Sequence, residues 1–350
     1  MNNCKNCGST IIFSPKDRAN VCVNCGSKFD IKYDPWFEKR IYDDKAINPR
    51  YKHKDISTLR EIKCKSCGAI VVLDKYHAQS ICPYCGDSEI VDIKSKINLL
   101  IDSIIPFAFD SKDALEIIKK KVKTSFLADK SILTALSEDA VYGLYVNSYV
   151  FDVKSNSAYK GVLTETRRRK DKDGRSYTET VSIPVSGEIE CNLDNITIEA
   201  NSNVNQQEIN AVFPFDYQRS VRYSLDFMNG YILEYPNNSL DEIYQEVKKI
   251  LDYSIKNKIL SKHHADYILT IDLDTNITDS RYNYSLLPIY FIRVETKKKK
   301  KYRIIMNGQT GKINSIPKSG WKIFGFILAI FGGLASIIFI ISMIISSLVG

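Results

Sequence analysis

Apolar residues recur every three or four positions in two segments, and this spacing predicts two amphipathic helices. The first helix is expected over residues 111–127, with Asp110 available as its N-cap. The second is expected over residues 240–260, where Ser239 and Glu242 have the spacing of a capping box. Both helices therefore have a start signal as well as an apolar face.

Alternating apolar and polar residues predict β-strands through most of the rest of the chain. The clearest pair covers residues 162–169 and 175–183, which flank an Asp-Gly turn. Together with a shorter helix near residues 221–228, these patterns predict an α+β body over residues 95–317 with largely antiparallel strands. The other predicted strands cover residues 90–93, 98–109, 143–153, 185–189, 196–199, 267–273, 286–295 and 302–306.

The C-terminal residues follow a different pattern, because no charged residue occurs between Ile323 and Val349. Such a run is long enough to cross a hydrocarbon core of about 30 Å, so residues 321–349 are predicted to form a single C-terminal transmembrane helix in contact with membrane lipid. Trp321 has the place of an interfacial anchor, and the flanking lysines put the N-terminal bulk in the cytosol. The sequence thus predicts a tail-anchored, single-pass protein of the cell membrane.

Small residues form a stripe along this predicted membrane helix. They are Gly325, Ala329, Gly332 and Ser336. A stripe of this kind lets two helices approach closely and would support a homo-oligomer through the membrane helix. The alternative is that small residues are simply common in membrane helices.

Eight cysteines form two copies of the pattern C-x2-C-x14-C-x2-C. The first copy is Cys4, Cys7, Cys22 and Cys25, and the second is Cys64, Cys67, Cys82 and Cys85. A glycine follows the second cysteine of each pair, which suits the tight backbone curl around a metal ion. The spacing predicts two zinc ribbons, each a short hairpin closed by one structural Zn²⁺ with no open coordination position. Four disulfides are the alternative, and they would need an oxidising compartment.

Composition adds few constraints to this picture. The chain has 350 residues, enough for two or more domains, and its 44% hydrophobic and 26% charged residues exclude a wholly disordered protein. The ninth cysteine, Cys191, is left over, and the use of the other eight as ligands suits a reducing cytosol. The expected domains are zinc ribbon 1 over residues 1–30, a charged and aromatic linker over 31–61, zinc ribbon 2 over 62–94, the α+β body over 95–317 and the transmembrane helix over 321–349.

Two basic segments are candidate contacts for anions. The predicted hairpin carries Arg167, Arg168, Arg169, Lys170 and Arg175 near its tip. They are candidates for contact with phosphates or acidic lipids, although a solvated strand edge that prevents edge-to-edge pairing is the favoured interpretation. The lysine run 297–301 is open to the same two interpretations, an anionic-lipid patch or a plain turn.

Catalytic motifs are not found. Residues 308–312 resemble a phosphate-binding loop, but Ile313 stands where a serine or threonine would bind magnesium. Asp272 and Asp274 share one face of a predicted strand and are interpreted as a surface pair. The sequence therefore predicts a protein that is not an enzyme.

Several segments along the chain resemble one known family. They include the paired cysteine patterns, residues 105–107, 143–149, 177–180, 214–217 and 286–290, and above all the Asn-Gly-Gln-Thr-Gly block at residues 307–311. In these features the chain resembles bacterial membrane-associated proteins that contain a transcription factor IIB-type zinc ribbon, a family of undefined function whose members are often mislabelled as primosomal helicase-like. The resemblance implies zinc binding and membrane association but no reaction.

These observations predict a tail-anchored zinc-ribbon protein that acts as a non-enzymatic binding or adaptor module for a protein partner at the cytosolic membrane face. The alternative is a membrane-associated nucleic-acid-binding protein that uses the ribbons and the basic hairpin. Replacing Cys67 with serine is expected to unfold the second ribbon and to leave the body largely intact.

Overall fold

The computed structural model of the chain describes most of its residues. They are residues 3–42, 59–74, 82–85, 87–93, 101–200, 206–234, 236 and 238–325, together with 328–330, 337–338 and 341 near the C-terminus. Residues 43–58 of the predicted linker 31–61 lie outside these residues. The described part is an α+β fold with one large mixed sheet and one small sheet.

The two predicted amphipathic helices are confirmed as α1 (Ser111–Thr124) and α3 (Leu240–His263). The Asp110 carboxylate accepts the N–H of Asp113 at 2.9 Å, and Ser239 with Glu242 forms the capping box. The helix predicted near residues 221–228 is wrong, because a two-residue strand precedes a 3₁₀ turn there. The short helical elements are α2 (Gln206–Val212), η1 (Lys130–Thr134), η2 (Glu138–Ala140), η3 (Tyr217–Arg219) and η4 (Leu225–Met228).

Three long antiparallel strands dominate the large sheet. They are β9 (Val141–Lys170), β10 (Ser176–Glu199) and β13 (Tyr267–Glu295), with β9 paired to both of the others. The sequence predicts these strands as shorter fragments. The polar residues between the fragments, such as Lys154 and Asn156, instead lie on the exposed face of a continuous strand.

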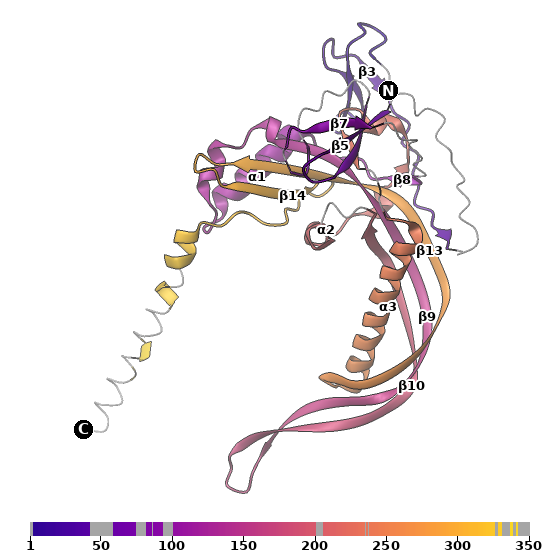
Figure 1. Ribbon diagram of the computed structural model, residues 1–350, viewed down its shortest axis with the longest axis vertical. Helices are drawn as coiled ribbons and strands as arrows, with labels where there is room; N and C mark the ends of the chain where they lie inside the picture. The colour runs from indigo at the N-terminus through magenta and orange to yellow at the C-terminus, as the bar shows by residue number, and fades with distance from the viewer. Residues whose placement is uncertain are drawn as a thin grey trace.

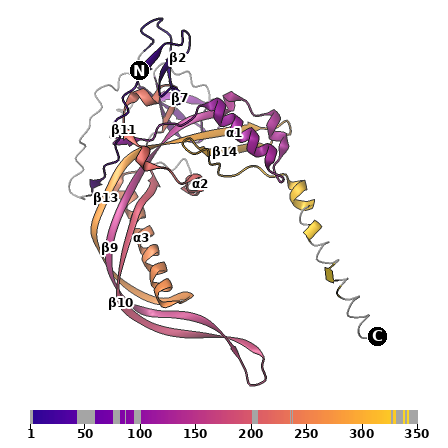
Figure 2. The same cartoon turned by 180° about the vertical axis from the view of Figure 1, so that it is seen from behind.

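The long strands curve around α3. Figure 1 shows α3 along the concave side of β9, β10 and β13, and Figure 2 shows the same arrangement from behind. Phe151 and Leu163 of β9 pack there in one core with Ile255 and Ile259 of α3, and all four side chains are buried. This part of the sheet therefore has one apolar face, covered by a single helix, and one polar face.

Gly161 of β9 is required where β13 bulges between Ile268 and Thr270. A Cβ atom at position 161 would lie 2.2 Å from the Thr270 carbonyl oxygen and 2.8 Å from the Ile271 Cα. Because both neighbours are backbone atoms, we expect Gly161→Ala to lower the free energy of unfolding by about 1–3 kcal/mol or more. Urea unfolding measures the change. Gly320→Ala, which adds a Cβ in open space, is the control, and equal stability of the two variants would refute the prediction.

Shorter strands complete the large sheet. Its order is β11-β8-β13-β9-β12-β6-β5-β7, with β10 on β9 and with β14 and β4 on β13. The pairs β8–β13 and β12–β9 are parallel, so the sheet is mixed rather than purely antiparallel. The strands are β4 (Arg40–Ile41), β5 (Leu59–Cys64), β6 (Ile70–Asp74), β7 (Ile90–Ile93), β8 (Ser103–Ile104), β11 (Val221–Arg222), β12 (Ile232–Glu234) and β14 (Lys301–Asn307).

The two cysteine modules differ in how they join this fold. The first cysteine module, residues 3–30, has its own small sheet of β1 (Ile11–Ser14), β2 (Ala19–Cys22) and β3 (Lys28–Asp30). The second cysteine module, the described residues of 59–93, supplies β5, β6 and β7 to the large sheet. Only the first module therefore has a sheet separate from the body.

The predicted transmembrane helix requires correction. A membrane span needs about 20 consecutive apolar helical residues, and no helix among the described residues is long and apolar enough to cross a membrane. Of residues 321–349, the structure describes only 321–325, 328–330, 337–338 and 341, and the rest of the predicted span lies outside the described residues. The predictions of a single C-terminal transmembrane helix and of a single-pass protein of the cell membrane with a cytosolic bulk are accordingly wrong.

Candidate metal centres

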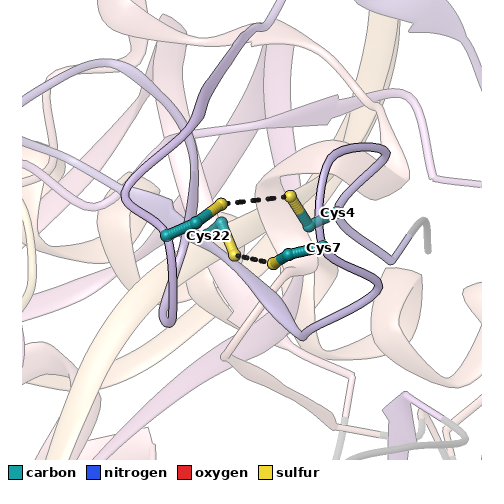
Figure 3. A group of neighbouring side chains, drawn as sticks. Cys4, Cys7 and Cys22 are labelled. Atoms are coloured by element: carbon teal, nitrogen blue, oxygen red, sulfur yellow. Dashed lines mark hydrogen bonds between the residues drawn. The ribbon is translucent and has the colours of Figure 1, made fainter.

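The first cysteine module brings its four thiols together. The Sγ atoms of Cys4 and Cys25 are 3.5 Å apart and those of Cys7 and Cys22 are 3.4 Å apart, and all four lie within 4.8 Å of one another. Figure 3 shows Cys4, Cys7 and Cys22 converging from the two ends of the module. Four sulfurs at about 2.3 Å from a tetrahedral ion would be about 3.8 Å apart. The group can therefore hold a metal ion, and its sulfurs are too far apart for a disulfide bond of about 2.05 Å.

The second cysteine module repeats this geometry. Cys64 and Cys85 are 3.5 Å apart at their Sγ atoms, and Cys67 and Cys82 are 3.7 Å apart. In both modules the first cysteine of each pair is buried and the second is exposed. The metal would thus lie between buried and solvent-exposed thiols in each module.

All four cysteine pairs share one backbone turn. The N–H of the first cysteine donates to the carbonyl five residues ahead, as from Cys4 to Ser9 at 2.8 Å and from Cys64 to Ala69 at 2.9 Å. Gly8 and Gly68 lie inside these turns with φ of +74° and +75°, where side chains are disfavoured. The predicted role of these glycines is confirmed by their backbone geometry, while Gly86 lies outside the described residues.

Local groups act on individual thiols before any metal binds. Hydrogen bonds from Ser27, whose hydroxyl lies 3.0 Å from the Cys25 sulfur, lower the pKa of Cys25 to about 6. Burial raises the pKa of Cys82. A bound cation favours the thiolate at every ligand, so metal binding would release protons from the more weakly acidic thiols.

The body holds the second module through several side chains. Arg293 of β13 donates from Nη2 to the Cys82 carbonyl oxygen at 2.5 Å, and Tyr84 packs its ring 5.6 Å from that of Phe291. β6 also pairs with β12, where Val72 is the register partner of Leu233. By contrast, the first module meets the body mainly around Phe13, whose ring lies 5.4 Å from that of Phe227.

Comparisons with known proteins assign no family to this chain. No family model matches it. No solved structure matches it. The chain is similar to the "Uncharacterized protein YdjG" of Bacillus subtilis (strain 168), with 24% identity over 351 residues that cover 99% of this chain and 97% of that protein. The resemblance to proteins with a transcription factor IIB-type zinc ribbon thus remains a prediction.

The basic hairpin lies apart from both metal centres. Figure 1 shows the tip of β9 and β10 at the opposite end of the molecule from the N-terminal modules. Arg167 pairs with Glu165 at 2.8 Å and Arg169 pairs with Glu179 at 2.5 Å, so two of the predicted anion contacts already have carboxylate partners. The structure does not combine the hairpin and the cysteine modules into one surface.

The loop at residues 308–312 has a structural role. Asn307 is buried, and its Oδ1 accepts the N–H groups of Gln309 at 2.8 Å and Thr310 at 2.9 Å. Its Nδ2 donates to the carbonyl oxygens of Val212 and Pro214. The backbone amides that a phosphate loop would offer are thus occupied by the protein itself.

A buried pair of carboxyl groups next to the second module is missed by the sequence analysis. Glu199 ends β10 and Glu234 ends β12, and both are buried. The Tyr84 hydroxyl donates to Glu234 Oε1 at 2.5 Å, and burial together with the charge of Glu234 raises the pKa of Glu199 well above its usual range. The other three carboxylate oxygens have no hydrogen-bond partner among the described residues, so a proton on one of the two groups would let it donate to the other. No local spacing signals this pair, since strand pairing alone brings the two residues together.

Proposed function

We propose that the chain is a non-enzymatic binding protein in which two structural Zn²⁺ ions hold cysteine modules that present a surface to a protein partner. The observation that supports this proposal is the grouping of eight cysteines into two four-sulfur sets of tetrahedral size. A tetrahedral four-sulfur set favours zinc among the common metals and leaves no coordination position for substrate. The ions would therefore stabilise the modules and take no part in a reaction.

The metal assignment is tested by elemental analysis of the full chain prepared with zinc present. We expect two zinc ions per chain, falling to one in Cys7→Ser and to one in Cys67→Ser. A content near zero in the wild-type chain, or loss of both ions in Cys7→Ser alone, would contradict two independent sites.

The first module offers the clearer partner surface. Val23 lies between Cys22 and Cys25, and its side chain is 58% exposed. An exposed apolar side chain beside a rigid metal-bound turn is suited to packing against another protein. We infer that Val23 contacts the partner.

Proximity labelling in cells compares the wild-type chain with Val23→Asp. Ile41→Asp is the matched control, because Ile41 is also apolar and 70% exposed but belongs to β4 of the body. A set of labelled neighbours that is lost in Val23→Asp and kept in Ile41→Asp supports the proposal. Identical sets in all three proteins would overturn it.

Nucleic-acid binding is the second candidate. Arg168, Lys170 and Arg175 at the hairpin tip are exposed, and none has an ion-pair partner among the described residues. If these side chains contact phosphates, the logarithm of the binding constant falls with the logarithm of salt concentration by about 0.7–0.9 per contact. A salt titration with single-stranded and double-stranded DNA measures this slope, and absence of binding at low salt excludes the class.

A further inference from the structure

A cavity of 590 Å³ lies where the C-terminal segment meets the lysine turn between β13 and β14. Its volume is within the range of about 300–1,000 Å³ that is typical of small-molecule sites. Lys298 and Lys300 line it from the turn, Trp321 and Phe324 line it from the C-terminal segment, and Asp129 and Ser131 line it from the start of η1. The cavity thus combines cationic and aromatic walls.

The aromatic wall is exposed although it is held in place. Trp321 is 85% exposed and Phe324 is 55% exposed, and their rings lie edge to face with centroids 6.3 Å apart. Backbone hydrogen bonds from Ser319 to Leu127 and from Asp129 to Pro317, each 2.8 Å long, fix the chain just before them. Two large aromatic side chains are therefore presented to solvent on an anchored segment, which is the usual sign of a binding surface.

The cationic wall is anchored in the same way. Thr296 accepts the N–H of Lys299 at 2.8 Å and donates its own N–H to the Lys300 carbonyl oxygen at 2.9 Å, which fixes the backbone of the turn. The Lys298 and Lys300 side chains have no ion-pair partner within the described residues. Lys301, in the same run of five lysines, pairs with Glu295 at 4.0 Å.

The acidic residue in the cavity is already used by the protein. Asp129 Oδ1 accepts the N–H of Ser131 at 3.0 Å and its hydroxyl at 2.7 Å, while Oδ2 accepts the Tyr302 hydroxyl at 3.0 Å. These bonds satisfy the carboxylate as the N-cap of η1. The hydrogen bond from Ser131 and, to a smaller extent, the charge of Lys300 hold the pKa of Asp129 below its usual range, but neither Lys298 nor Lys300 makes an ion pair with it, so both ammonium groups can contact an external anion.

We propose that this cavity binds an anionic amphiphile, with its acid group between Lys298 and Lys300 and its apolar chain along Trp321 and Phe324. The lysine ammonium groups provide charge-assisted hydrogen bonds to the acid group. The aromatic rings provide the apolar area that a purely ionic site lacks. This ligand site is distinct from the cysteine modules and goes beyond the function proposed for them.

Decyl phosphate, used below its micelle-forming concentration, is the probe. The chain has two tryptophans, so Trp36→Phe leaves Trp321 as the only one and makes its fluorescence a direct report on the cavity. We expect a saturable blue shift of Trp321 emission with decyl phosphate. Inorganic phosphate and decanol, which supply one half of the ligand each, are expected to bind at least about tenfold more weakly.

Two double substitutions in the lysine turn distinguish binding in the cavity from binding to the positive charge of the turn as a whole. We expect Lys298→Ala with Lys300→Ala to weaken decyl phosphate binding by about tenfold or more. Lys297→Ala with Lys299→Ala removes the same charge from residues that do not line the cavity, and its affinity is expected to stay within about twofold of wild type. A shift that does not saturate, equal affinity for decanol, or equal weakening in both double variants would overturn the proposal.

Discussion

Cys67→Ser is expected to destabilise the body of the protein, whereas Cys7→Ser is expected to affect only the first cysteine module. Each residue is the exposed second cysteine of the first pair in its module, so the two substitutions are chemically matched. The second module supplies β5, β6 and β7 to the large sheet, and β6 pairs with β12, which in turn pairs with β9. Loss of the proposed zinc ion would therefore release strands on which the body depends.

The expected loss of stability in Cys67→Ser is large because zinc binding contributes much of the folding free energy of such modules. Zinc binding contributes about 10–16 kcal/mol to the folding of small zinc modules, while a whole domain is stable by about 5–15 kcal/mol. Hydrogen exchange measured by residue separates the two variants. We expect Cys67→Ser to lower protection at Leu233 and along the start of β9, and Cys7→Ser to lower it only within residues 4–30.

The same experiment also tests the expectation from the sequence that Cys67→Ser unfolds the second module and leaves the body largely intact. The cysteine spacing suggests that the second module unfolds alone, because its residues are contiguous in the chain. Full protection of β12 and β9 in Cys67→Ser would restore that interpretation and would contradict the role of the module in the sheet.

Raising the pH from about 6 to about 8.5 is expected to destabilise the wild-type chain relative to Glu234→Gln. Burial raises the pKa of Glu234 to about 8, and burial together with the charge of Glu234 holds the pKa of Glu199 well above its usual range. Glu208 adds a further negative charge near Glu199, and Tyr84 is the hydroxyl donor to the pair. Ionisation of both groups is therefore expected to destabilise the folded chain.

The direction of this pH effect on stability follows from the number of protons bound by the folded and the unfolded chain. Between the ordinary glutamate pKa of 4.5 and about 8, the folded chain keeps a proton that the unfolded chain releases. The contribution to stability is complete below the unfolded pKa and is lost as the pH rises through the folded pKa, by at most about 1.4 kcal/mol per pH unit. In Glu234→Gln the side-chain amide can donate to Glu199 and carries no proton that titrates in this range. The stability of the variant relative to wild type should therefore increase with pH.

Urea unfolding at several pH values measures this difference. The range starts near pH 6 because zinc thiolates are protonated in stronger acid. Glu188→Gln, at an exposed position of the same strand β10, is the control and should show a constant difference from wild type. A constant difference for Glu234→Gln as well would show that the buried pair does not share a proton.

The sequence predicts the elements whose signals are local. The N-caps at Asp110 and Ser239 mark the starts of α1 and α3, and the glycines after the cysteine pairs mark the tight turns that carry the thiols. The long strands are predicted only as fragments. Some interruptions are β-bulges, such as the one between Leu193 and Ile196 of β10, and a bulge leaves the strand continuous although it disturbs the apolar alternation. The interruption in β9 is instead a run with exposed polar residues such as Lys154 and Asn156.

Features that depend on distant pairing could not be predicted. The place of β6 in the large sheet depends on β12, which is only three residues long and lies more than 150 positions later in the chain. The contact of Glu199 with Glu234 has the same origin, because each residue ends a strand whose neighbours are set by the whole sheet. Short segments of this kind gain their structure from tertiary contacts and carry little signal of their own.

The most direct test of the two metal centres is zinc K-edge X-ray absorption fine structure of the full chain loaded with zinc. The sulfur distances of 3.4–3.7 Å in both modules predict closed sites in which every zinc has four sulfur neighbours at about 2.3 Å. A spectrum fitted by sulfur alone at that distance is the expected result. A substantial nitrogen or oxygen shell, or fewer than four sulfurs per zinc, would contradict two closed structural sites.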